Sequence, residues 1–360
     1  MAALAGGGLA LNGCAAPVRS RVAVIGAGLA GLNAAFQLQK QGLAPTVYEG
    51  RSRVGGRVYT RSQVWGNATY LDLGAVLINS DHEEVKTLCQ ELGVPLYERQ
   101  GSPDLENTAF FFDNRRIPIA EMGAALAPIA SQLAADAALL EQDFERHGSA
   151  LDRLSATAYL DRHREKIEKP FVRSLLQAAM RSEYGSELAD LSVLGLLYLL
   201  PTVEQGQVEV ISQSDEAYAI VGGSGRLAEA LAAQLTNPIQ FQKTLKTLAP
   251  EGKAYRLTFA DGTAETVDAA IVTLPPPALR QVEMGVPLPP TLQRYFQEIQ
   301  LGRNEKQFGR FRQRVWREAG GFGDACWSDR GFCTGWDDSV RVGAPKARSR
   351  FSTAAAKWRP

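Results

Sequence analysis

The stretch Gly26-Ala27-Gly28-Leu29-Ala30-Gly31 decides the fold of this chain. It matches the pattern G-x-G-x-x-G and lies between a short apolar run, residues 21–25, and a run with helical apolar spacing, residues 29–41. A second apolar run, residues 45–48, ends at Glu49, close to the spacing of about 20 residues that this pattern requires. The order of strand, glycine turn, helix and strand predicts a βαβ unit that binds a dinucleotide.

Each glycine of this turn has a different expected purpose. Gly26 permits the tight turn, Gly28 lets the backbone approach a pyrophosphate, and Gly31 lets the helix pack closely against the strand. The amides at the start of the helix, where Leu29 and Ala30 lie, are expected to carry the charge of the phosphates.

The residues that follow distinguish FAD from NAD as the dinucleotide. Residues 49–60 read EGRSRVGGRVYT, which resembles the R-x-G-G-R-x-x-T signature of two-dinucleotide-domain flavoproteins. There Arg57 would make a charge-assisted bond to the diphosphate, for which Gly55 and Gly56 leave room. Glu49 is expected to accept hydrogen bonds from the adenosine ribose, and the extended signature disfavours an NAD enzyme. The predicted cofactor site also includes Gly50 and Arg51.

Taken in order, these motifs resemble those of the flavin-dependent amine oxidases, the family of monoamine, polyamine and L-amino-acid oxidases. Residues 71–75 are similar to the stretch beside the isoalloxazine of FAD in that family, and residues 220–227 to its GG-x-x-x-L entry into a helix. Residues 242–248 resemble its strand near the adenine. The resemblance therefore adds Gly74, Ala75 and Leu245 to the predicted FAD site.

One lysine is identified as catalytic by the same resemblance. The residues Leu301-Gly302-Arg303-Asn304-Glu305-Lys306 resemble the motif in which a lysine four residues after a Leu-Gly pair holds a water against flavin N5. A lone lysine is usually solvated, so the role of Lys306 depends on this match. The resemblance implies that an amine or amino acid passes a hydride to FAD and that oxygen takes the electrons. It also implies that Lys306 assists reoxidation of the flavin.

The pattern predicts an α/β fold with a discontinuous FAD-binding domain. A Rossmann-like domain with a parallel sheet and a βαβ opening is interrupted by an α+β substrate domain that carries a helical insertion. The helical insertion covers about 120–200, with breaks at Gly148, Pro170 and Gly185. Hairpins are expected at Asp113-Asn114 and, as a type I′ turn, at Asp261-Gly262. The expected FAD domain is 21–105 with 206–280, the substrate domain is 106–205 with 281–340, and residues 1–20 and 344–360 are a signal-like or disordered segment and a basic disordered tail.

Composition excludes several other classes of function. Lysine plus arginine and aspartate plus glutamate both number 39, so the formal net charge of zero gives no electrostatic argument for nucleic acid as a partner. The best inner apolar run, residues 191–200, is too short to span a bilayer, so no integral membrane segment is predicted. The three histidines and four cysteines show no metal-ligand spacing, so no metal site is predicted. The expected partners are a small-molecule amine and oxygen, and no oligomeric state is predicted.

The two ends of the sequence leave location and completeness open. Residues 1–16 resemble the later part of an export signal, and Leu11-Asn12-Gly13-Cys14 resembles a lipoprotein cleavage box, so both a cytoplasmic and an exported location stay open. The family resemblance stops near Asp338, and we expect the chain to lack the C-terminal strand and helix that complete the flavin site.

Two other functions stay open at this point. A flavin desaturase or isomerase for an apolar substrate would share the nucleotide-binding half, although Lys306 favours an amine oxidase. A non-catalytic flavoprotein remnant is the second alternative, because the flavin-closing segment is expected to be missing.

Overall fold

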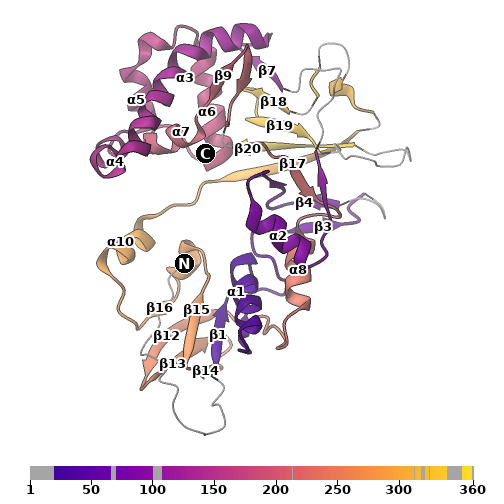
Figure 1. Ribbon diagram of the computed structural model, residues 1–360, viewed down its shortest axis with the longest axis vertical. Helices are drawn as coiled ribbons and strands as arrows, with labels where there is room; N and C mark the ends of the chain where they lie inside the picture. Colours follow the sequence, from indigo (N-terminus) through magenta and orange to yellow (C-terminus); the bar gives the residue numbers. More distant parts are fainter. Residues whose placement is uncertain are drawn as a thin grey trace. The chain divides into compact units, whose positions relative to one another are not determined.

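The computed structural model describes residues 20–65, 70–99, 108–212, 214–311, 313–317, 321–323, 325–338 and 351–358. The chain divides into two compact units, the first made of residues 1–97 and 218–300 and the second of residues 98–217 and 301–360 (Figure 1). Both units are discontinuous in sequence. The N-terminal segment 1–19 and residues 344–350 of the basic tail lie outside the described residues.

The expected domain boundaries after residues 105, 205 and 280 lie after residues 97, 217 and 300 in this division, and the last of them differs most. Residues 281–300, which we assigned to the substrate domain, cluster with the first unit. The reason is a parallel pairing between β16 (Glu283–Met284) and β12 (Leu245–Glu251), a strand of the first unit. Main-chain pairing of two short strands leaves no clear hydrophobic pattern in the sequence.

The first unit is built on the predicted βαβ opening. Its parallel sheet has the order β15-β1-β2, with β1 (Val22–Ile25) between β2 (Thr46–Tyr48) and β15 (Ala269–Val272). All four residues of β1 are buried, as is usual for the central strand of a parallel sheet. Helix α1 (Leu29–Lys40) connects β1 to β2.

Helix α1 begins directly after the glycine turn and packs on the sheet through one apolar face. Its buried side chains Leu32, Ala35 and Phe36 recur at helical spacing and join Val24 and Val47 in one cluster. A second helix, α8 (Gly225–Ala233), packs in the same cluster through Ala228 and Leu231. The remaining elements of this unit are β3 (Thr60–Ser62), β4 (Tyr70–Asp72), β5 (Leu77–Ile78), α2 (Glu83–Glu91), β6 (Leu96–Glu98), β11 (Tyr218–Ile220), α9 (Pro276–Leu279) and α10 (Pro290–Glu298).

A hairpin of β13 (Ala254–Phe259) and β14 (Ala264–Val267) corrects the turn type that we expected. Of the two turn residues, only Gly262 has a positive φ, +83°, whereas a type I′ turn needs two. The amide of Gly262 donates to the carbonyl oxygen of Phe259 over 3.0 Å. This is a type I turn followed by a glycine in the left-handed region, which adds one residue to the loop.

The second unit contains a mixed sheet of order β17-β20-β19-β18-β7-β8. The strands are β7 (Thr108–Phe112), β8 (Arg115–Ile117), β17 (Asn304–Phe311), β18 (Ala325–Ser328), β19 (Thr334–Asp337) and β20 (Phe351–Trp358). Here the prediction of a disordered tail is wrong for residues 351–358, which form β20. The backbone of β20 pairs with strands on both sides, and such main-chain pairing does not need the apolar period that we looked for.

The hairpin between β7 and β8 turns at Asp113-Asn114, as predicted. Both residues have a positive φ, +52° and +62°, and Phe112 pairs with Arg115, which defines a two-residue type I′ turn. Phe110 and Ile117 on the two strands are fully buried in the larger apolar cluster. The turn chemistry and the buried face therefore agree on one register.

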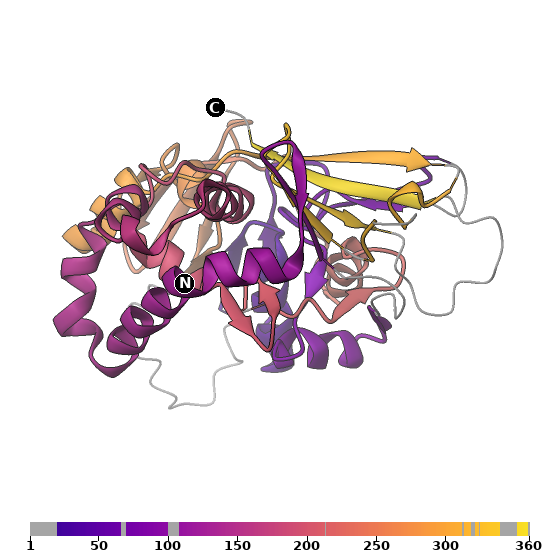
Figure 2. The same ribbon diagram turned by 90° about the horizontal axis from the view of Figure 1, so that it is seen from above.

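The helical insertion lies in the second unit, where its helices are coloured magenta (Figure 2). Pro170 begins α6 and Gly185 ends it in the left-handed conformation, so both act as the expected breaks. The third expected break is wrong, because Gly148 lies inside α4, where a Cβ would be 2.9 Å from the ring of Phe144. Apart from the six-stranded sheet, the elements of the second unit are α3 (Ile119–Gln142), α4 (Phe144–Asp152), α5 (Ala156–Arg162), the 3₁₀ turns η1 (Arg164–Lys166) and η2 (Val315–Arg317), α6 (Pro170–Tyr184), α7 (Val193–Leu199), β9 (Thr202–Glu204) and β10 (Gln207–Glu209).

Within the described residues, α3 is the one helix whose length and composition would allow it to cross a membrane. This differs from our expectation, which took residues 191–200 as the best apolar candidate. One such helix is weak evidence for a membrane span, because core helices of other proteins meet the same criteria.

Candidate dinucleotide site and lysine strand

The three glycines of the turn have different surroundings: two lie too close to other atoms to carry a side chain, and one has open space beside it. A Cβ added at Gly31 would lie 1.9 Å from the carbonyl oxygen of Gly26, and one at Gly26 would lie 2.7 Å from Oγ1 of Thr273. Gly26 also has a φ of +107°, which other residues rarely adopt. At Gly28, by contrast, no atom beyond the adjacent chain lies within 4 Å of an added Cβ among the described residues. The open space therefore lies at the N-cap of α1, next to Leu29 and Ala30.

Glu49 is held beside this turn by main-chain amides. One carboxylate oxygen accepts a hydrogen bond from the amide of Ala27 over 2.9 Å, and the other accepts from the amide of Arg51 over 2.8 Å. The backbone of Glu49 is fixed as well, by Gln240 on one side and Lys243 on the other. Each carboxylate oxygen has a second lone pair, so the half-buried side chain can still accept from a ligand.

The R-x-G-G-R loop packs onto the same turn through its backbone. The amide of Gly55 donates to the carbonyl oxygen of Ala27 over 2.8 Å. A Cβ at Gly56 would lie 3.3 Å from Cα of Gly28, so the two chain segments approach closely. The structure thus brings together the two glycine motifs that the sequence separates by more than 20 residues.

Sequence reasoning missed the function of Arg53. Its guanidinium donates to the carbonyl oxygen of Gly56 over 2.9 Å and lies 4.1 Å from the ring centroid of Tyr59. Arg53 therefore holds the loop that carries Arg57, whose own side chain is exposed. The signal was available, because Arg53 is the first arginine of the R-x-G-G-R pattern.

Gly74 and Ala75 lie against the same loop. The amide of Ala75 donates to the carbonyl oxygen of Arg57 over 3.2 Å, and a Cβ at Gly74 would lie 1.9 Å from that oxygen. A side chain at position 74 would push the segment between β4 and β5 away from the loop. The glycine of the LDLGA stretch is therefore explained by the close approach of its backbone to the carbonyl oxygen of Arg57.

A buried carboxylate connects the LDLGA stretch, residues 71–75, to the glycine motif of residues 220–227. Asp72 accepts hydrogen bonds from the hydroxyl of Thr60 and from the amide of Ser224, at the start of α8. The hydroxyl of Thr60 in turn accepts from the amide of Gly225 over 2.7 Å. The chain's own acid thus occupies the N-terminal end of α8, where an anion is favoured.

Two other predicted residues lie at the edge of the site. Leu245 is 4% exposed and belongs to the apolar cluster that contains Phe259 and Tyr48, so its side chain is not free to touch a ligand. Its predicted place near the adenine stays a prediction that can involve only its backbone. Gly50 lies against Thr244, whose Oγ1 would be 3.0 Å from an added Cβ.

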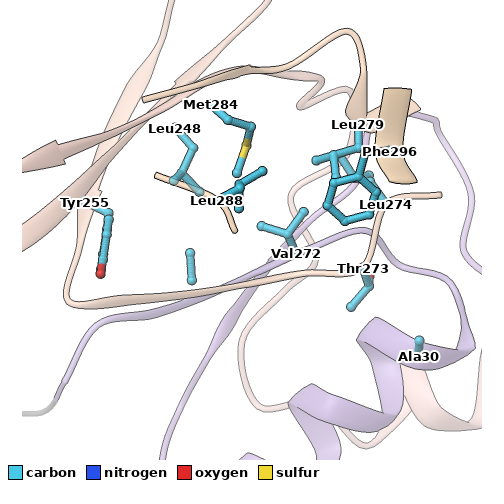
Figure 3. A pocket seen from close by; sticks show the side chains of 11 residues that line it. Ala30, Leu248, Tyr255, Val272, Thr273, Leu274, Leu279, Met284, Leu288 and Phe296 are labelled. Atoms are coloured by element: carbon cyan, nitrogen blue, oxygen red, sulfur yellow. The ribbon is translucent and has the colours of Figure 1, made fainter. Parts of the chain in front are cut away.

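An apolar cavity of about 220 Å³ lies next to the glycine turn in the first unit (Figure 3). Val272 and Leu274 point into it from the β15 segment, while Leu279 and Phe296 come from α9 and α10. Its other lining residues are Ala30, Leu248, Tyr255, Ala270, Thr273, Met284 and Leu288. The only polar groups among its lining side chains are the hydroxyls of Thr273 and Tyr255, and no carboxylate, imidazole or amine lines it.

An anchored glycine, Gly302, lies two residues before β17, the strand that carries Lys306. A Cβ at Gly302 would lie 1.6 Å from the carbonyl oxygen of Tyr184, at the end of α6. The amide of Arg303 donates to the carbonyl oxygen of Gly185 over 2.8 Å. The Leu-Gly pair of the lysine motif therefore joins β17 to the C-terminus of α6.

Lys306 itself lies on β17 and is half-buried. Its Nζ lies 5.6 Å from the ring centroid of Trp336 on β19. Lys306 belongs to the second unit, whereas the predicted FAD-binding residues belong to the first.

The comparisons with known proteins agree with these observations. The family model described as flavin containing amine oxidoreductase matches residues 29–353. The chain belongs to this family. It is therefore an FAD-dependent oxidoreductase that acts on amines, and its fold is the α/β fold with a Rossmann-like FAD domain that the sequence predicted.

The alignments with individual relatives cover most of this chain but only part of each relative. A flavin-containing monoamine oxidase of Mycobacterium tuberculosis is 28% identical over 323 residues, which are 84% of this chain and 67% of the relative. An L-amino acid dehydrogenase of Synechocystis is 24% identical, and the alignment covers 84% of this chain and 67% of the dehydrogenase. The Oncorhynchus mykiss amine oxidase is 23% identical, and the chain spans 58% of its length.

Solved structures show the same fold. Putrescine oxidase aligns with a TM-score of 0.75 at 18% identity, over 94% of this chain and 75% of its own. Cyclohexylamine oxidase from Brevibacterium oxydans aligns with a TM-score of 0.72, also at 18% identity. At this identity the likeness concerns the fold and not the substrate.

Proposed function

We propose that this chain oxidises a primary or secondary amine, or an amino acid, at the carbon that bears the nitrogen, with oxygen as the electron acceptor. Family membership supports FAD-dependent amine oxidation, and the open space at Gly28 beside the fixed carboxylate of Glu49 carries the proposal for this chain. A Rossmann turn without that space would leave no room for a diphosphate.

The residues of the first unit fit FAD. The amides at the start of α1, next to Gly28, would bind the diphosphate, and the exposed guanidinium of Arg57 would add a charge-assisted bond. Glu49 would accept from the ribose hydroxyls with its remaining lone pairs. When bound, FAD supplies the hydride acceptor that no side chain provides.

Lys306 is the proposed catalytic residue. Its ammonium would hold a water near the reacting part of the flavin and assist the return of electrons to oxygen. The anchored start of β17 supports this proposal, because Gly302 and Arg303 restrict where the strand can lie.

The test of the activity uses the purified full chain with FAD. We expect a yellow protein whose flavin absorbance is bleached without oxygen by at least one member of a panel of amines and amino acids. Air should then restore the colour with release of hydrogen peroxide. A yellow protein that no amine bleaches would contradict oxidation of these substrates, and a protein that stays colourless with FAD would contradict the cofactor site.

The test of Lys306 is the substitution Lys306→Met. We expect slower reoxidation of the reduced flavin by oxygen and little change in its reduction by the amine, both measured by stopped-flow absorbance. Gln307→Met is the matched control, because Gln307 is exposed and lies next on the same strand. Equal effects on the two half-reactions would remove the proposed function of Lys306.

A further inference from the structure

We propose that Trp336 is a positioning residue for Lys306, whose ammonium it holds against the face of its indole ring. The inference rests on the proposed function of Lys306 and adds a residue that the motif does not contain. The contact is a cation–π pair, with Nζ of Lys306 5.6 Å from the ring centroid. This distance lies within the range in which an aromatic face attracts a cation.

The strand register explains why the two side chains meet. Lys306 pairs with position 356 of β20, and Trp336 pairs with position 354 of the same strand. Directly paired residues of antiparallel strands share a face, as do residues two apart along one strand. Lys306 and Trp336 therefore lie on one face of the sheet, on the two strands that flank β20 and two residues apart in register.

An aromatic partner suits the proposed task of this lysine. The lysine side chain has four rotatable methylene groups, so an unrestrained ammonium would spend little time at one point. A ring face attracts the ammonium without taking its charge, and it does not accept a strong directional hydrogen bond.

The indole nitrogen of Trp336 does not explain the position of the ring. Among the described residues, the buried Nε1 of Trp336 has no hydrogen-bond partner. Leaving a buried donor unpaired is unfavourable, so hydrogen bonding within the described residues does not account for the placement of this ring. Two other tryptophans of the second unit differ, since Trp316 donates to Asp337 over 3.2 Å and Trp327 is buried in the apolar cluster.

The first experiment compares Trp336→Phe with Trp336→Leu in the FAD-loaded protein. Phenylalanine keeps an aromatic face and leucine does not, while neither has a donor. We expect Trp336→Leu to slow reoxidation by oxygen about three- to tenfold, Trp336→Phe to retain most of the rate, and both to leave reduction by the amine nearly unchanged. Equal slowing in both variants would overturn the proposal, because it would assign the effect to the indole donor or to packing.

The second experiment needs no activity and is made on the protein without FAD. Denaturant unfolding is measured for Trp336→Leu, Lys306→Met and the double variant. We expect the double variant to lose less stability than the sum of the two single losses, because the second substitution removes a partner that is already absent. Additive losses would show that the two side chains are not coupled and would overturn the proposal.

These two readouts separate failure of the proposal from failure of the proposed function. If no amine reduces the wild-type flavin, the proposed activity fails, while the unfolding cycle still tests the contact. If the wild type turns over and the cycle is additive, the activity stands and the function of Trp336 falls.

Discussion

The turn at residues 26–31 and the segment that leads into β17 each contain a glycine packed against a carbonyl oxygen, but the two oxygens lie at different distances along the chain. In each, a glycine Cα lies so close to a carbonyl oxygen that a side chain would collide with it. For Gly31 the oxygen belongs to Gly26, five residues earlier, whereas for Gly302 it belongs to Tyr184, the last residue of α6. The first contact is complete within one motif, and the second exists only after α6 and β17 have come together.

The surroundings of the two glycines differ as much as their range. Gly31 is buried between β1 and α1, but Gly302 is exposed. Equal collisions should therefore have unequal consequences, because an exposed segment can shift and a packed helix cannot. The substitutions below test that difference, in order of decreasing expected effect.

Gly31→Ala should have the largest effect. Its Cβ would collide with backbone, so we expect the free energy of unfolding to fall by about 3 kcal/mol, measured by denaturant titration. Gly28→Ala is the matched control: it should change stability by less than about 0.5 kcal/mol while it fills space that the diphosphate needs. Similar losses of stability in both variants would contradict the division of the turn into structural and open glycines.

Glu49→Ala should weaken FAD binding by about 1.5–3 kcal/mol, because it removes the charged acceptor that we propose for the ribose. The same change leaves the amide of Ala27 without its acceptor, so stability should fall as well. Glu49→Gln separates the two effects, since an amide oxygen can still accept from one of the backbone amides. FAD affinity is measured by flavin fluorescence quenching, and unchanged affinity in Glu49→Ala would count against the ribose contact.

Gly302→Ala should cost less stability than Gly31→Ala, about 1 kcal/mol, because the exposed start of β17 can move away from Tyr184. The movement should instead appear in function, as slower flavin reoxidation with normal FAD affinity. A loss of stability as large as that of Gly31→Ala would show that this junction is as rigid as the glycine turn.

Asp268→Asn should have the smallest effect, below about 1 kcal/mol, because the ion pair with Arg21 is exposed. Hydrogen bonds from the side chain and backbone of Arg21 lower the pKa of Asp268 below its usual value. The pair therefore stabilises the folded chain above the unfolded pKa of about 3.9, and this contribution disappears as pH falls through the lower folded pKa. Unfolding at pH 6 and pH 3 should show a larger acid loss in wild type than in the variant. Equal losses would remove this assignment.

The accuracy of the sequence-based expectations followed the presence of a local signal. The βαβ opening, the Asp113-Asn114 turn and the ends of α6 were predicted, because glycines, turn residues or a proline mark each of them in the sequence. Strand β20 and the place of residues 281–300 were not, because they depend on main-chain pairing that no such residue marks. At Asp261-Gly262 the hairpin was predicted and the turn type was wrong, since two different turns accept the same Asp-Gly pair.

The sequence by itself determined the dinucleotide turn, its acid and the family to which the chain belongs, because glycines and an acid at set spacings leave few ways to pack a helix on a strand. Tertiary structure alone decided which glycine is left open, that Arg53 holds the loop of Arg57, and that Trp336 lies against Lys306. These last three facts depend on distances between segments that separate elements bring together. Such distances leave no periodic trace in the order of the residues, so only the folded chain contains them.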